Sequence, residues 1–312
     1  MKVIRDYQFL EVADKGASVA IGNFDGVHLG HQSVIDIALN KARELHAPLG
    51  VLTFEPHPRT YFAPSAPPFR LMSAEARETR LSKIGVDVLY ELNFNSNLSS
   101  LTPREFAQNV IHDGLGLRSV VVGADFCFGK GRTGTVGDLL RYGKEMGFGV
   151  SIAPLITAGL GEVSSTSIRN ALGDGRPQDA ADQLGHLHRI EGPVISGEQR
   201  GRELGYPTAN MSMEGLHLPK LGVYAVLVDV QDGPYKGTYH GAASIGVRPM
   251  FGKNNPNLET FIFDFSGDLY GVHLSIALVE FLRPELELAG VEELVEEMAK
   301  DCDKAREVLS SL

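Results

Sequence analysis

The alternation of short apolar runs with amphipathic segments over the first 155 residues constrains the fold of this chain more than any other feature. Apolar runs typical of buried strands occur at 17–21, 49–54, 87–92, 119–122 and 150–154. Segments with helical periodicity lie between them, at 33–45, 74–84, 103–113 and 136–146. Strands that alternate with helices build a parallel sheet, which binds ligands at the carboxyl ends of its strands. The first half is therefore predicted to be an α/β domain with a doubly wound parallel sheet.

The pattern changes near residue 186, where strand-like runs follow one another and are separated by turns rich in glycine, proline and asparagine. These runs occupy 189–195, 223–230, 239–245, 258–265 and 274–281, and an amphipathic helix is expected at 291–310. Short strands at regular spacing predict a small closed antiparallel β-barrel. Two short helices are expected before it, at 167–172 and 177–184. Because 312 residues exceed the usual size of a single core, we expect domains over 1–185 and 186–312.

The composition narrows the class of protein. Hydrophobic residues make up 43% and charged residues 22%, which is ordinary for a globular chain. The sequence contains no apolar run of about 18 residues, so no membrane span is expected. The first ten residues lack the apolar region of a secretory signal. The two cysteines, Cys127 and Cys302, lie far apart and fit no metal spacing, so a cytoplasmic protein is expected. The net charge of −10 disfavours a nucleic-acid partner, and the sequence predicts no oligomeric state.

The segment 22–32, which reads GNFDGVHLGHQ, joins the first strand to the first helix. Phosphate groups are commonly held at such a turn. The glycines at 22, 26 and 30 allow the backbone to approach a ligand closely, because no Cβ blocks it. His28 and His31 are three residues apart and share one face of the first helical turn. A His-x-x-His pair on its own is also typical of a surface pair or of part of a metal site.

A second stretch, SSTSIR at 164–169, has similar chemistry. Three consecutive hydroxyl side chains at the start of a helix are usually an N-cap. A cap does not explain an arginine on the same turn, however, and Arg169 follows within it. Together with the histidine turn, these residues predict a phosphate clamp built from two ends of one domain.

With these residues, the chain resembles a known family. The histidine pair is similar to that of the His-x-Gly-His nucleotidylyltransferases. Over residues 15–308 the chain resembles the bacterial bifunctional riboflavin kinases/FMN adenylyltransferases, also called FAD synthetases. The other matching strings are TFEPHPR at 53–59, GADFCFG at 123–129, GRELGYPTAN at 201–210 and DFSGDLYG at 264–271. The resemblance implies a Rossmann-like nucleotidylyltransferase domain, then a riboflavin kinase barrel with a terminal helix.

For the adenylyltransferase half, the resemblance implies that His28, His31 and Arg169 are catalytic and stabilise charge on the phosphate oxygens. Six further residues are expected to bind ATP, namely Gly22, Phe24, Gly30, Ser164, Ser165 and Thr166. The flavin-binding residues are expected to be Phe54, Pro56, His57, Pro58, Phe62, Asp125 and Phe128. The first five form an apolar wall with an imidazole at its edge, which suits an isoalloxazine ring. Phe54 is alternatively a core residue, and Asp125 alternatively caps a turn.

For the kinase half, the resemblance implies that Thr208 and Asn210 bind Mg²⁺ and ATP and that Arg202 binds ATP. Hydroxyl and amide oxygens suit a hard cation that also rests on phosphates, so Mg²⁺ is expected to arrive with ATP. Glu259 is expected to accept the proton of the ribityl hydroxyl. Strand alternation places it on one face with Phe261 and Phe263. Two alternatives stay open, since Pro-Thr-x-Asn is also typical of a turn and Glu259 also fits a solvent-facing edge strand.

The sequence departs from the family at two places in the kinase half. Pro249-Met250-Phe251 stands where members usually have Pro-Thr-Phe, and Leu286-Glu287-Leu288 lacks a phenylalanine that members often carry there. The expected function is to convert riboflavin to FMN and FMN to FAD, with ATP in both steps. One alternative is an FMN adenylyltransferase whose barrel only binds flavin, and another is a flavin or nucleotide sensor without turnover. Intact Asn210 and Glu259 favour a working kinase.

Overall fold

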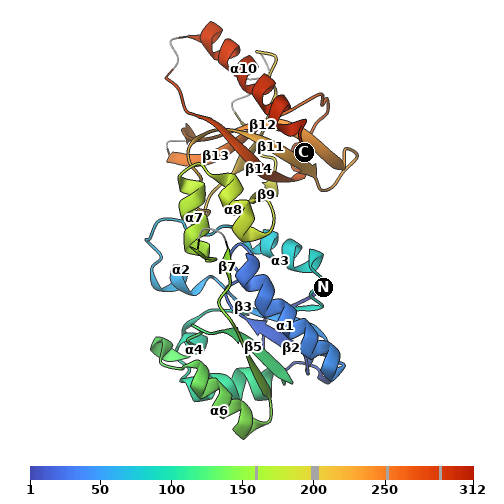
Figure 1. Cartoon of the computed structure of the whole chain (residues 1–312), viewed down its shortest axis with the longest axis vertical. Coiled ribbons are helices and arrows are strands. Elements are labelled where there is room, and N and C mark those ends of the chain that lie inside the picture. The colour runs from blue at the N-terminus through green and yellow to red at the C-terminus, as the bar shows by residue number, and fades with distance from the viewer. Residues whose placement is uncertain (159–160, 198–203, 251–252, 288–289) are drawn as a thin grey trace. The chain divides into compact units, whose positions relative to one another are not determined.

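The computed structural model describes residues 1–158, 161–197, 204–250, 253–287 and 290–312 (Figure 1). The chain divides into two compact units. The first contains residues 1–67 and 77–163, and the second contains residues 68–76 and 164–312. Each is described by itself below.

The first unit is built on a six-stranded parallel sheet with the order β1-β4-β3-β2-β5-β6. Its strands are β1 (Lys2–Ile4), β2 (Ser18–Ile21), β3 (Leu49–Glu55), β4 (Val88–Asn93), β5 (Ser119–Gly123) and β6 (Gly149–Ala153). β2 is central, since Ser18 is in register with Leu49 of β3 on one side and with Ser119 of β5 on the other. A short hairpin, β7 (Thr157–Ala158) with β8 (Gly161–Glu162), follows the sheet.

Several of the helices of this unit start at a capping side chain. They are η1 (Val12–Asp14), α1 (Leu29–Leu45), α2 (Pro58–Phe62), α3 (Ala74–Lys83), which begins in the second unit, α4 (Ser96–Ser99), α5 (Pro103–Glu105), the π-helix η2 (Phe106–Gly114), η3 (Lys130–Arg132) and α6 (Val136–Met146). Thr102 and Thr135 each close a capping box, at α5 and α6. None of the helices within the described ranges is both long and apolar enough to cross a membrane.

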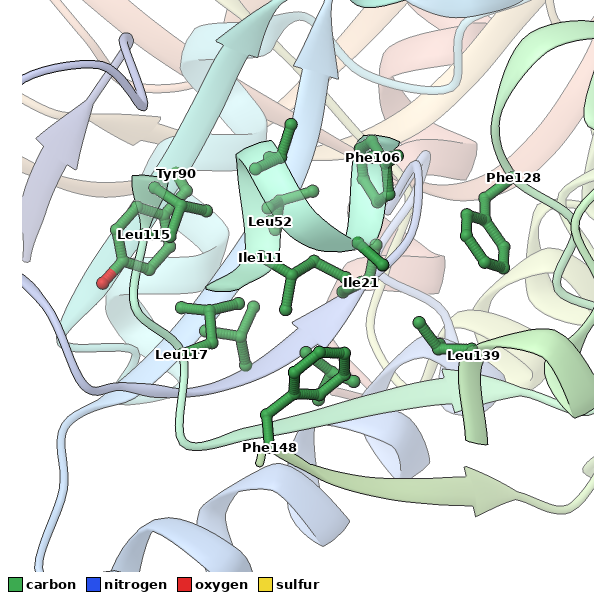
Figure 2. Packing of buried hydrophobic residues seen from close by; sticks show 14 of the residues in the cluster. Ile21, Leu52, Tyr90, Phe106, Ile111, Leu115, Leu117, Phe128, Leu139 and Phe148 are labelled. Atoms are coloured by element: carbon green, nitrogen blue, oxygen red, sulfur yellow. The ribbon is translucent and has the colours of Figure 1, made fainter. Parts of the chain in front are cut away.

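The core of the first unit lies between the sheet and η2 (Figure 2). Ile21 of β2, Leu52 of β3 and Tyr90 of β4 contribute from the sheet, and Phe106 and Ile111 contribute from η2. All five side chains are at most 4% exposed. Because β-strands fully buried on both faces read as continuous apolar runs, these strands were recognisable from sequence alone.

The second unit is an antiparallel barrel preceded by the helices α7 (Ser165–Gly173) and α8 (Pro177–Leu184). Its strand order is β10-β13-β12-β11-β14-β9. These strands are β9 (Arg189–Pro193), β10 (Thr208–Ser212), β11 (Gly222–Val230), β12 (Gly237–Met250), β13 (Lys253–Ile262) and β14 (His273–Pro284). The two end strands meet where the amide of Ile195, just after β9, donates to the carbonyl of Asn210 on β10 at 2.8 Å. This isolated bridge brings the two ends of the sheet together, so the barrel is nearly closed.

The barrel has an apolar interior and an apolar outer patch. Tyr224, Leu258 and Ile276 fill the interior and are at most 1% exposed. The outer patch, which includes Phe263, is covered by α10 (Val291–Leu309) through Ala305 and Leu309 and nearby side chains. The guanidinium of Arg283 on β14 donates to both carboxylate oxygens of Asp301 on α10, at 2.8 and 2.6 Å. The terminal helix is therefore held by both apolar and ionic contacts.

Residues 68–76 belong to the second unit although they lie within the sequence of the first. The carbonyl of Arg70 accepts a hydrogen bond from the amide of His217 at 2.8 Å, and Arg70 forms a β-bridge with Leu216. The carbonyl of Phe69 accepts from Nη1 of Arg169 at 3.2 Å. The second unit is thus made from two separate pieces of the chain.

The predicted fold class is confirmed: a parallel α/β sheet precedes a six-stranded antiparallel barrel with a terminal helix. Four strands, β1, β7, β8 and β10, were not predicted, and α1 begins four residues earlier than expected. The unit boundary after Val163 differs from the expected boundary at 185 between domains. The division into domains at 185 stays a prediction.

A buried histidine makes the stability of the second unit sensitive to acid. Burial, with smaller effects of His186 and His217, lowers the pKa of His188 from 6.5 to about 3. The fold keeps this ring neutral, whereas the unfolded chain takes up a proton below pH 6.5, so the stabilisation present above pH 6.5 is lost as the pH falls toward 3. Within this range, titration of this one group lowers the free energy of unfolding by about 1.4 kcal/mol for each unit by which the pH falls.

We therefore expect the free energy of unfolding of the His188→Gln variant to fall less steeply with acidification than that of the parent. Urea unfolding at a series of pH values between 6.5 and about 4 measures both slopes. A loss of packing in the variant lowers the free energy of unfolding equally at every pH and does not change the slope. A difference in slope therefore reports the titration of His188. Equal slopes contradict the expectation.

Candidate functional site

The parallel sheet brings three of the sequence motifs to one edge. β2 ends at Ile21, β3 at Glu55 and β5 at Gly123, and the three strands are parallel neighbours with β2 in the middle. From β2 the chain continues through β3 on one side and later returns as β5 on the other. The carboxyl ends of β2 and β5 therefore mark a topological switch point, which is where open α/β sheets bind their ligands.

The turn between β2 and α1 has an unusual backbone. Phe24 and Val27 have φ angles of 51° and 44°, and Gly26 has 88°. A left-handed backbone costs free energy in residues with a Cβ, most of all in a β-branched residue such as Val27, so it persists only where other contacts fix it. A Cβ on Gly22 would come within 3.3 Å of the Phe24 ring. The two predicted ATP-binding residues Gly22 and Phe24 thus share one tightly packed turn.

His28 and His31 lie together at the N-terminus of α1. His28 is the N-cap, and its Nδ1 accepts a hydrogen bond from the amide of His31 at 3.3 Å. The two rings stack, with centroids 3.6 Å apart and an angle of 19° between their planes. Because Nδ1 of His28 is an acceptor, the proton of its neutral ring lies on Nε2. No acidic residue in the first turn offsets the partial positive charge of the helix N-terminus, which suits a phosphate.

The environment of His31 is costly for a purely structural residue. Burial, and to a smaller extent the electrostatic effect of the adjacent His28 when that ring is protonated, lowers the pKa of His31 well below its ordinary value, so the ring is neutral at pH 7. Its buried Nδ1 has no hydrogen-bond partner among the residues that the structure describes. A buried polar atom left without a partner destabilises a fold, and such atoms call for a functional explanation.

Gly30, predicted to bind ATP, has a packing role that is visible in the structure. A Cβ at this position would lie 3.1 Å from both Cε1 and Nδ1 of His28. That separation is shorter than ordinary van der Waals contact, so a side chain here would displace the His28 ring. The glycine therefore fixes the space in which the histidine pair stacks.

The predicted flavin wall begins at the end of β3 as an aromatic group around Phe94. Phe54 packs edge-on against Phe94, with ring centroids 5.7 Å apart, and also contacts Phe106 of the core. Phe62 on α2 lies 5.8 Å from the same Phe94 ring and is 68% exposed. Phe54 is thus partly a core residue, as the alternative interpretation allowed, whereas Phe62 presents its ring to solvent. Their role in binding flavin stays a prediction.

His57 stands between Pro56 and Pro58 and is the N-cap of α2. Its Nδ1 accepts a hydrogen bond from the amide of Arg59 at 3.0 Å, and the residue is buried. As with His28, an acceptor at Nδ1 places the proton of the neutral ring on Nε2. Both histidines that end a strand-to-helix turn in this unit are held in the same tautomer by a backbone amide.

The loop after β5 carries Asp125 and Phe128. Asp125 is exposed, while Phe128 is buried in the core and contacts the rings of Phe126 and Phe106 at 5.6 and 5.8 Å. Asp125 is therefore accessible to a ligand at the switch point. Phe128 is mainly a packing residue, and its contact with a flavin stays a prediction.

The second phosphate motif opens α7 in the second unit. Ser164 is the N-cap and forms a capping box with Ser167, so the helix-cap interpretation of this serine is correct. Ser165 is half-buried and Thr166 is exposed. Arg169 donates to the carbonyl of Phe69 and, through Nη2, to Oγ1 of Thr166 at 3.3 Å. Thr166 and Arg169 thus lie side by side on the first turns of the helix.

The two parts of the predicted clamp belong to different compact units. His28 and His31 are in the first unit, whereas α7 begins at Ser165 and is in the second. Each part is locally ordered as a helix N-terminus with polar side chains. Their joint action on one phosphate chain stays a prediction.

The barrel places the kinase residues on two paired strands. Thr208 and Asn210 lie on β10, and Asn210 is directly opposite Glu259 of β13. The side-chain amide of Asn210 is buried and donates to the carbonyl of Thr208 at 3.3 Å. Phe261 follows Glu259 on the same face, and its ring contacts Phe263 at 5.9 Å. Glu259 and Phe261 are two residues apart on β13, as the alternation requires, whereas Phe263 lies beyond the end of this strand. β13 has strand neighbours on both sides, so it is not an edge strand.

Sequence reasoning missed Asn257, which joins these groups. Its buried amide nitrogen is 3.4 Å from Oδ1 of Asn210 and 3.2 Å from Oε1 of Glu259. Asn257 is two residues before Glu259, so the period of a strand was the one signal that could have indicated it. Gly197 also packs here, because a Cβ on it would come within 2.5 Å of the Asn210 amide.

The second unit contains a cavity of about 290 Å³ whose lining includes Thr208 but not Asn210, Asn257 or Glu259. Pro207, Thr208 and Ala209 of the Pro-Thr-x-Asn motif line one side of it. The other side is formed mainly by residues 265–270 of the DFSGDLYG motif. Two motifs that are far apart in sequence thus line one cavity, at the lower end of the size range of ligand pockets.

Several expectations fall outside what the structure describes. Arg202, expected to bind ATP, lies in the segment 198–203, which is outside the described residues. Phe251 and Leu288 are also outside the described residues. Met250 is the last residue of β12, but its side chain is not described. Among the described residues, no cluster of three or more His, Cys, Asp or Glu side chains has the geometry of a metal site.

Comparison with known proteins gives two adjacent matches to family models. Residues 10–167 match the FAD synthetase family, and residues 184–309 match the riboflavin kinase family. The first match includes both phosphate motifs up to Ser167, and the second includes the whole barrel and all of α10.

Full-length relatives have the same two parts. A bifunctional riboflavin kinase/FMN adenylyltransferase from Pseudomonas fluorescens is 39% identical over 98% of this chain and 97% of that protein. One from Listeria monocytogenes is 36% identical over 97% of this chain and 95% of that protein. Among solved structures, a macrolide-efflux protein from Streptococcus pneumoniae is 32% identical, covers 97% of this chain and 98% of its own, and has a TM-score of 0.83.

Proposed function

The chain belongs to the family of bifunctional riboflavin kinases/FMN adenylyltransferases, and on this premise we propose how its residues carry out the two reactions. It phosphorylates riboflavin with ATP to give FMN, and it transfers AMP from a second ATP to FMN to give FAD and pyrophosphate. Its substrates and products are accordingly riboflavin, FMN, FAD and ATP. A binding-only barrel and a sensor without turnover are not favoured, because both catalytic families match.

In adenylyl transfer, a phosphate oxygen of FMN attacks the α-phosphorus of ATP and pyrophosphate leaves. The nucleophile is already ionised, so the protein has to orient the reactants and stabilise charge rather than remove a proton. We assign this task to His28 and His31. The observation that carries the assignment is the stacked pair at the N-terminus of α1, with the His28 proton held on Nε2 at the switch point of the sheet. From there His28 can donate to a phosphate oxygen.

Arg169 and the hydroxyls of Ser164, Ser165 and Thr166 are assigned to the triphosphate tail and the departing pyrophosphate in the same reaction. The adjacency of Thr166 Oγ1 and Arg169 Nη2 supports a shared anionic ligand, since both are donors to phosphate. Gly22, Phe24 and Gly30 are assigned to the ATP-binding turn. The isoalloxazine ring is assigned to the aromatic wall with exposed Phe62, together with His57 and Asp125.

In the kinase reaction, the ribityl hydroxyl attacks the γ-phosphorus of ATP, and ADP leaves. We assign Glu259 as the base that accepts the hydroxyl proton and Asn257 as the residue that orients it, since the Asn257 amide donates to Glu259 Oε1. Thr208 and Asn210 are assigned to Mg²⁺ and ATP. Their hydroxyl and amide oxygens lie two residues apart on β10, and Thr208 lines the cavity, so the donor set fits this ion. When bound, Mg²⁺ supplies charge neutralisation of the phosphates.

The metal is expected to bind only together with nucleotide. Thr208 and Asn210 offer two neutral oxygens, and Mg²⁺ held by so few protein ligands needs phosphates to complete its shell. Isothermal calorimetry should therefore give negligible heat when Mg²⁺ is added to the protein alone and clear binding when ATP is present. The Asn210→Ala variant should weaken the second signal. Stoichiometric uptake of Mg²⁺ without nucleotide would contradict the assignment.

We also propose that the boundary in the sequence between the two catalytic domains lies near residue 185. The family matches end at 167 and begin again at 184, which supports a boundary within or just after α8. The helices α7 and α8 pack with the barrel in the second compact unit. On this proposal they are structurally part of one unit while Arg169 serves the reaction of the other domain.

One experiment tests the assigned function directly. The purified protein is incubated with riboflavin, ATP and Mg²⁺, and riboflavin, FMN and FAD are separated by chromatography over time. FMN should form first and FAD should follow. Absence of both products contradicts the function, and FMN without FAD would leave the chain a kinase alone.

A further inference from the structure

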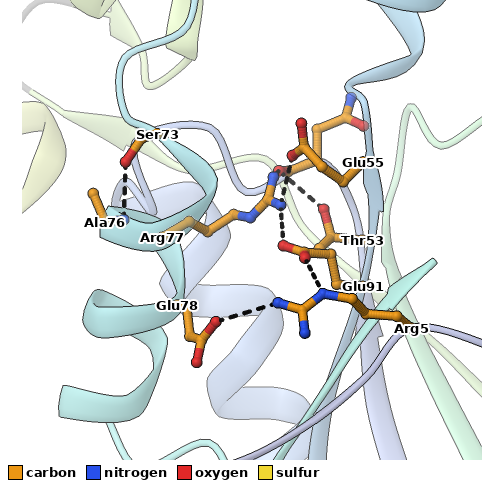
Figure 3. A network of polar contacts seen from close by, with 9 residues as sticks. Arg5, Thr53, Glu55, Ser73, Ala76, Arg77, Glu78 and Glu91 are labelled. Carbon is orange, nitrogen blue, oxygen red and sulfur yellow. Dashed lines mark hydrogen bonds and ion pairs between the residues drawn. The ribbon is translucent and has the colours of Figure 1, made fainter. Parts of the chain in front are cut away.

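Arg77 of α3 is a charged side chain buried inside the first unit. It is 0% exposed, and its Nη2 donates to Oε2 of Glu91 on β4 at 2.9 Å and to Oε2 of Glu55 on β3 at 3.1 Å (Figure 3). Arg5 donates to the other oxygen of Glu91 at 3.2 Å. We call Arg5, Glu55, Arg77 and Glu91 the Arg77 cluster.

Stability alone does not explain this cluster. Removing charges from water is costly, and a buried ion pair is seldom more stabilising than apolar side chains of similar volume. The Nε of Arg77 is in addition buried and lacks a hydrogen-bond partner within the described part of the chain. The guanidinium is therefore maintained at a cost, which points to a role other than packing.

The third contact of Arg77 indicates that role. Its Nη1 lies 3.5 Å from the carbonyl oxygen of Asn23, and the same oxygen accepts a hydrogen bond from Oγ1 of Thr53 at 3.2 Å. Asn23 is exposed, so this carbonyl is held by two side chains although its own side chain faces solvent. The carbonyl belongs to the peptide that links Asn23 to Phe24, the first left-handed residue of the turn.

The turn after Asn23 needs such support. Phe24 and Val27 both have a left-handed backbone, which is unfavourable and persists only when surrounding contacts determine it. The turn ends at His28, whose ring is placed by the cap of α1 and by the close approach of Gly30. A rotation of the peptide after Asn23 would change the direction of the chain that leads to His28.

We propose that Arg77 is a positioning residue for adenylyl transfer: with Thr53 it fixes the carbonyl of Asn23 and so holds the turn that carries His28 and His31. Glu91 and Glu55 orient the guanidinium, and Arg5 only adds charge at the rim of the cluster. The inference rests on the proposed function of the histidine pair. A misplacement of about 1 Å at a reacting group can cost about 10²-fold in rate.

The test uses variants of the full-length protein, with riboflavin phosphorylation by the same molecules as the internal reference. Arg77→Met should lower kcat for FMN adenylylation by about 10²-fold while kcat for the kinase reaction is unchanged. Arg77→Lys retains a positive charge and N–H donors and should recover much of the loss. Thr53→Val, which removes one neutral hydrogen bond to the same carbonyl and no charge, should cost about fivefold.

Arg5→Gln is the matched control. This change removes the positive charge of Arg5 beside Glu91 but no contact with Asn23. The Arg5 side chain is 65% exposed, so adenylylation should keep the parent rate. The losses in the Arg77→Met and Thr53→Val variants should appear in kcat rather than in KM for FMN. The ring ¹⁵N signals of His28 and His31 should shift in Thr53→Val but not in Arg5→Gln.

Parent rates in Thr53→Val, with unshifted histidine signals, overturn the proposal even if Arg77→Met fails to fold. So does a parent rate in a folded Arg77→Met protein. The proposed function is judged separately, by the parent and by His28→Ala. If the parent makes FAD and His28→Ala does not, while the Arg77 and Thr53 variants are fully active, only the positioning role is wrong.

Discussion

Replacing His28 by alanine is expected to lower the rate of FAD formation about 10²–10³-fold, the cost of removing one donor to charge that develops in a transition state. FMN formation by the same protein should continue at the parent rate, because Glu259, Thr208 and Asn210 all belong to the barrel. The measurement is the separate rate of each step, with FMN or riboflavin as the starting flavin.

Two further variants separate catalysis from structure. His28 is also the N-cap of α1, and alanine removes that cap. Asparagine is a good N-cap that lacks the imidazole Nε2, so His28→Asn should be as stable as the parent and still fail to make FAD. His112→Ala, at an exposed histidine, should leave both rates unchanged. An active His28→Asn protein would assign the residue a capping role only.

The reciprocal expectation concerns Glu259. Glutamine has nearly the same shape but cannot accept the ribityl proton, so Glu259→Gln should lower FMN formation about 10²–10⁴-fold, the usual contribution of a general base. Conversion of supplied FMN to FAD should remain at the parent rate. Glu280→Gln, at another strand glutamate of the barrel, is the matched control and should be fully active in both steps.

Taken with His28→Ala, the Glu259 variant gives a two-way separation of the activities. Each variant should lose one step and keep the other, and a mixture of the two proteins should make FAD from riboflavin. A Glu259→Gln protein that phosphorylates riboflavin at the parent rate would remove Glu259 from the reaction. Simultaneous loss of both steps in either folded variant would contradict two independent sites.

The sequence predicts most of the architecture because the elements follow simple periodicities. The buried strands β2 to β5 lie in mainly apolar runs, although β4 contains Glu91. The helix α8 was predicted at its observed bounds, with Pro177 in its first turn. The start of α1 was placed too late. Gly30 and His31 occupy its first turn, and these residues have low helix propensity, so only the cap at His28 reveals the true start.

The site was predictable where one motif contains it and was missed where it depends on pairing between strands. No strand was predicted at β10, and a turn was one alternative there because Pro-Thr-x-Asn is typical of turns. In the structure Ala209, Asn210 and Met211 are buried in the barrel. Asn257 and Arg77 were missed for the same reason. Asn257 contacts Asn210 on another strand, and Arg77 contacts the carbonyl of Asn23 from a helix. No local sequence pattern indicates which elements become neighbours.

The discontinuous second unit affects the order in which the growing chain acquires structure during synthesis. The parallel sheet of the first unit is complete once β6 has been made, whereas residues 68–76 then still lack the partners that they find at Arg169, Leu216 and His217. Domains fold largely as units as they leave the ribosome. The contacts of this segment with Arg169, Leu216 and His217 therefore form only after those residues have been translated, when the parallel sheet is already complete.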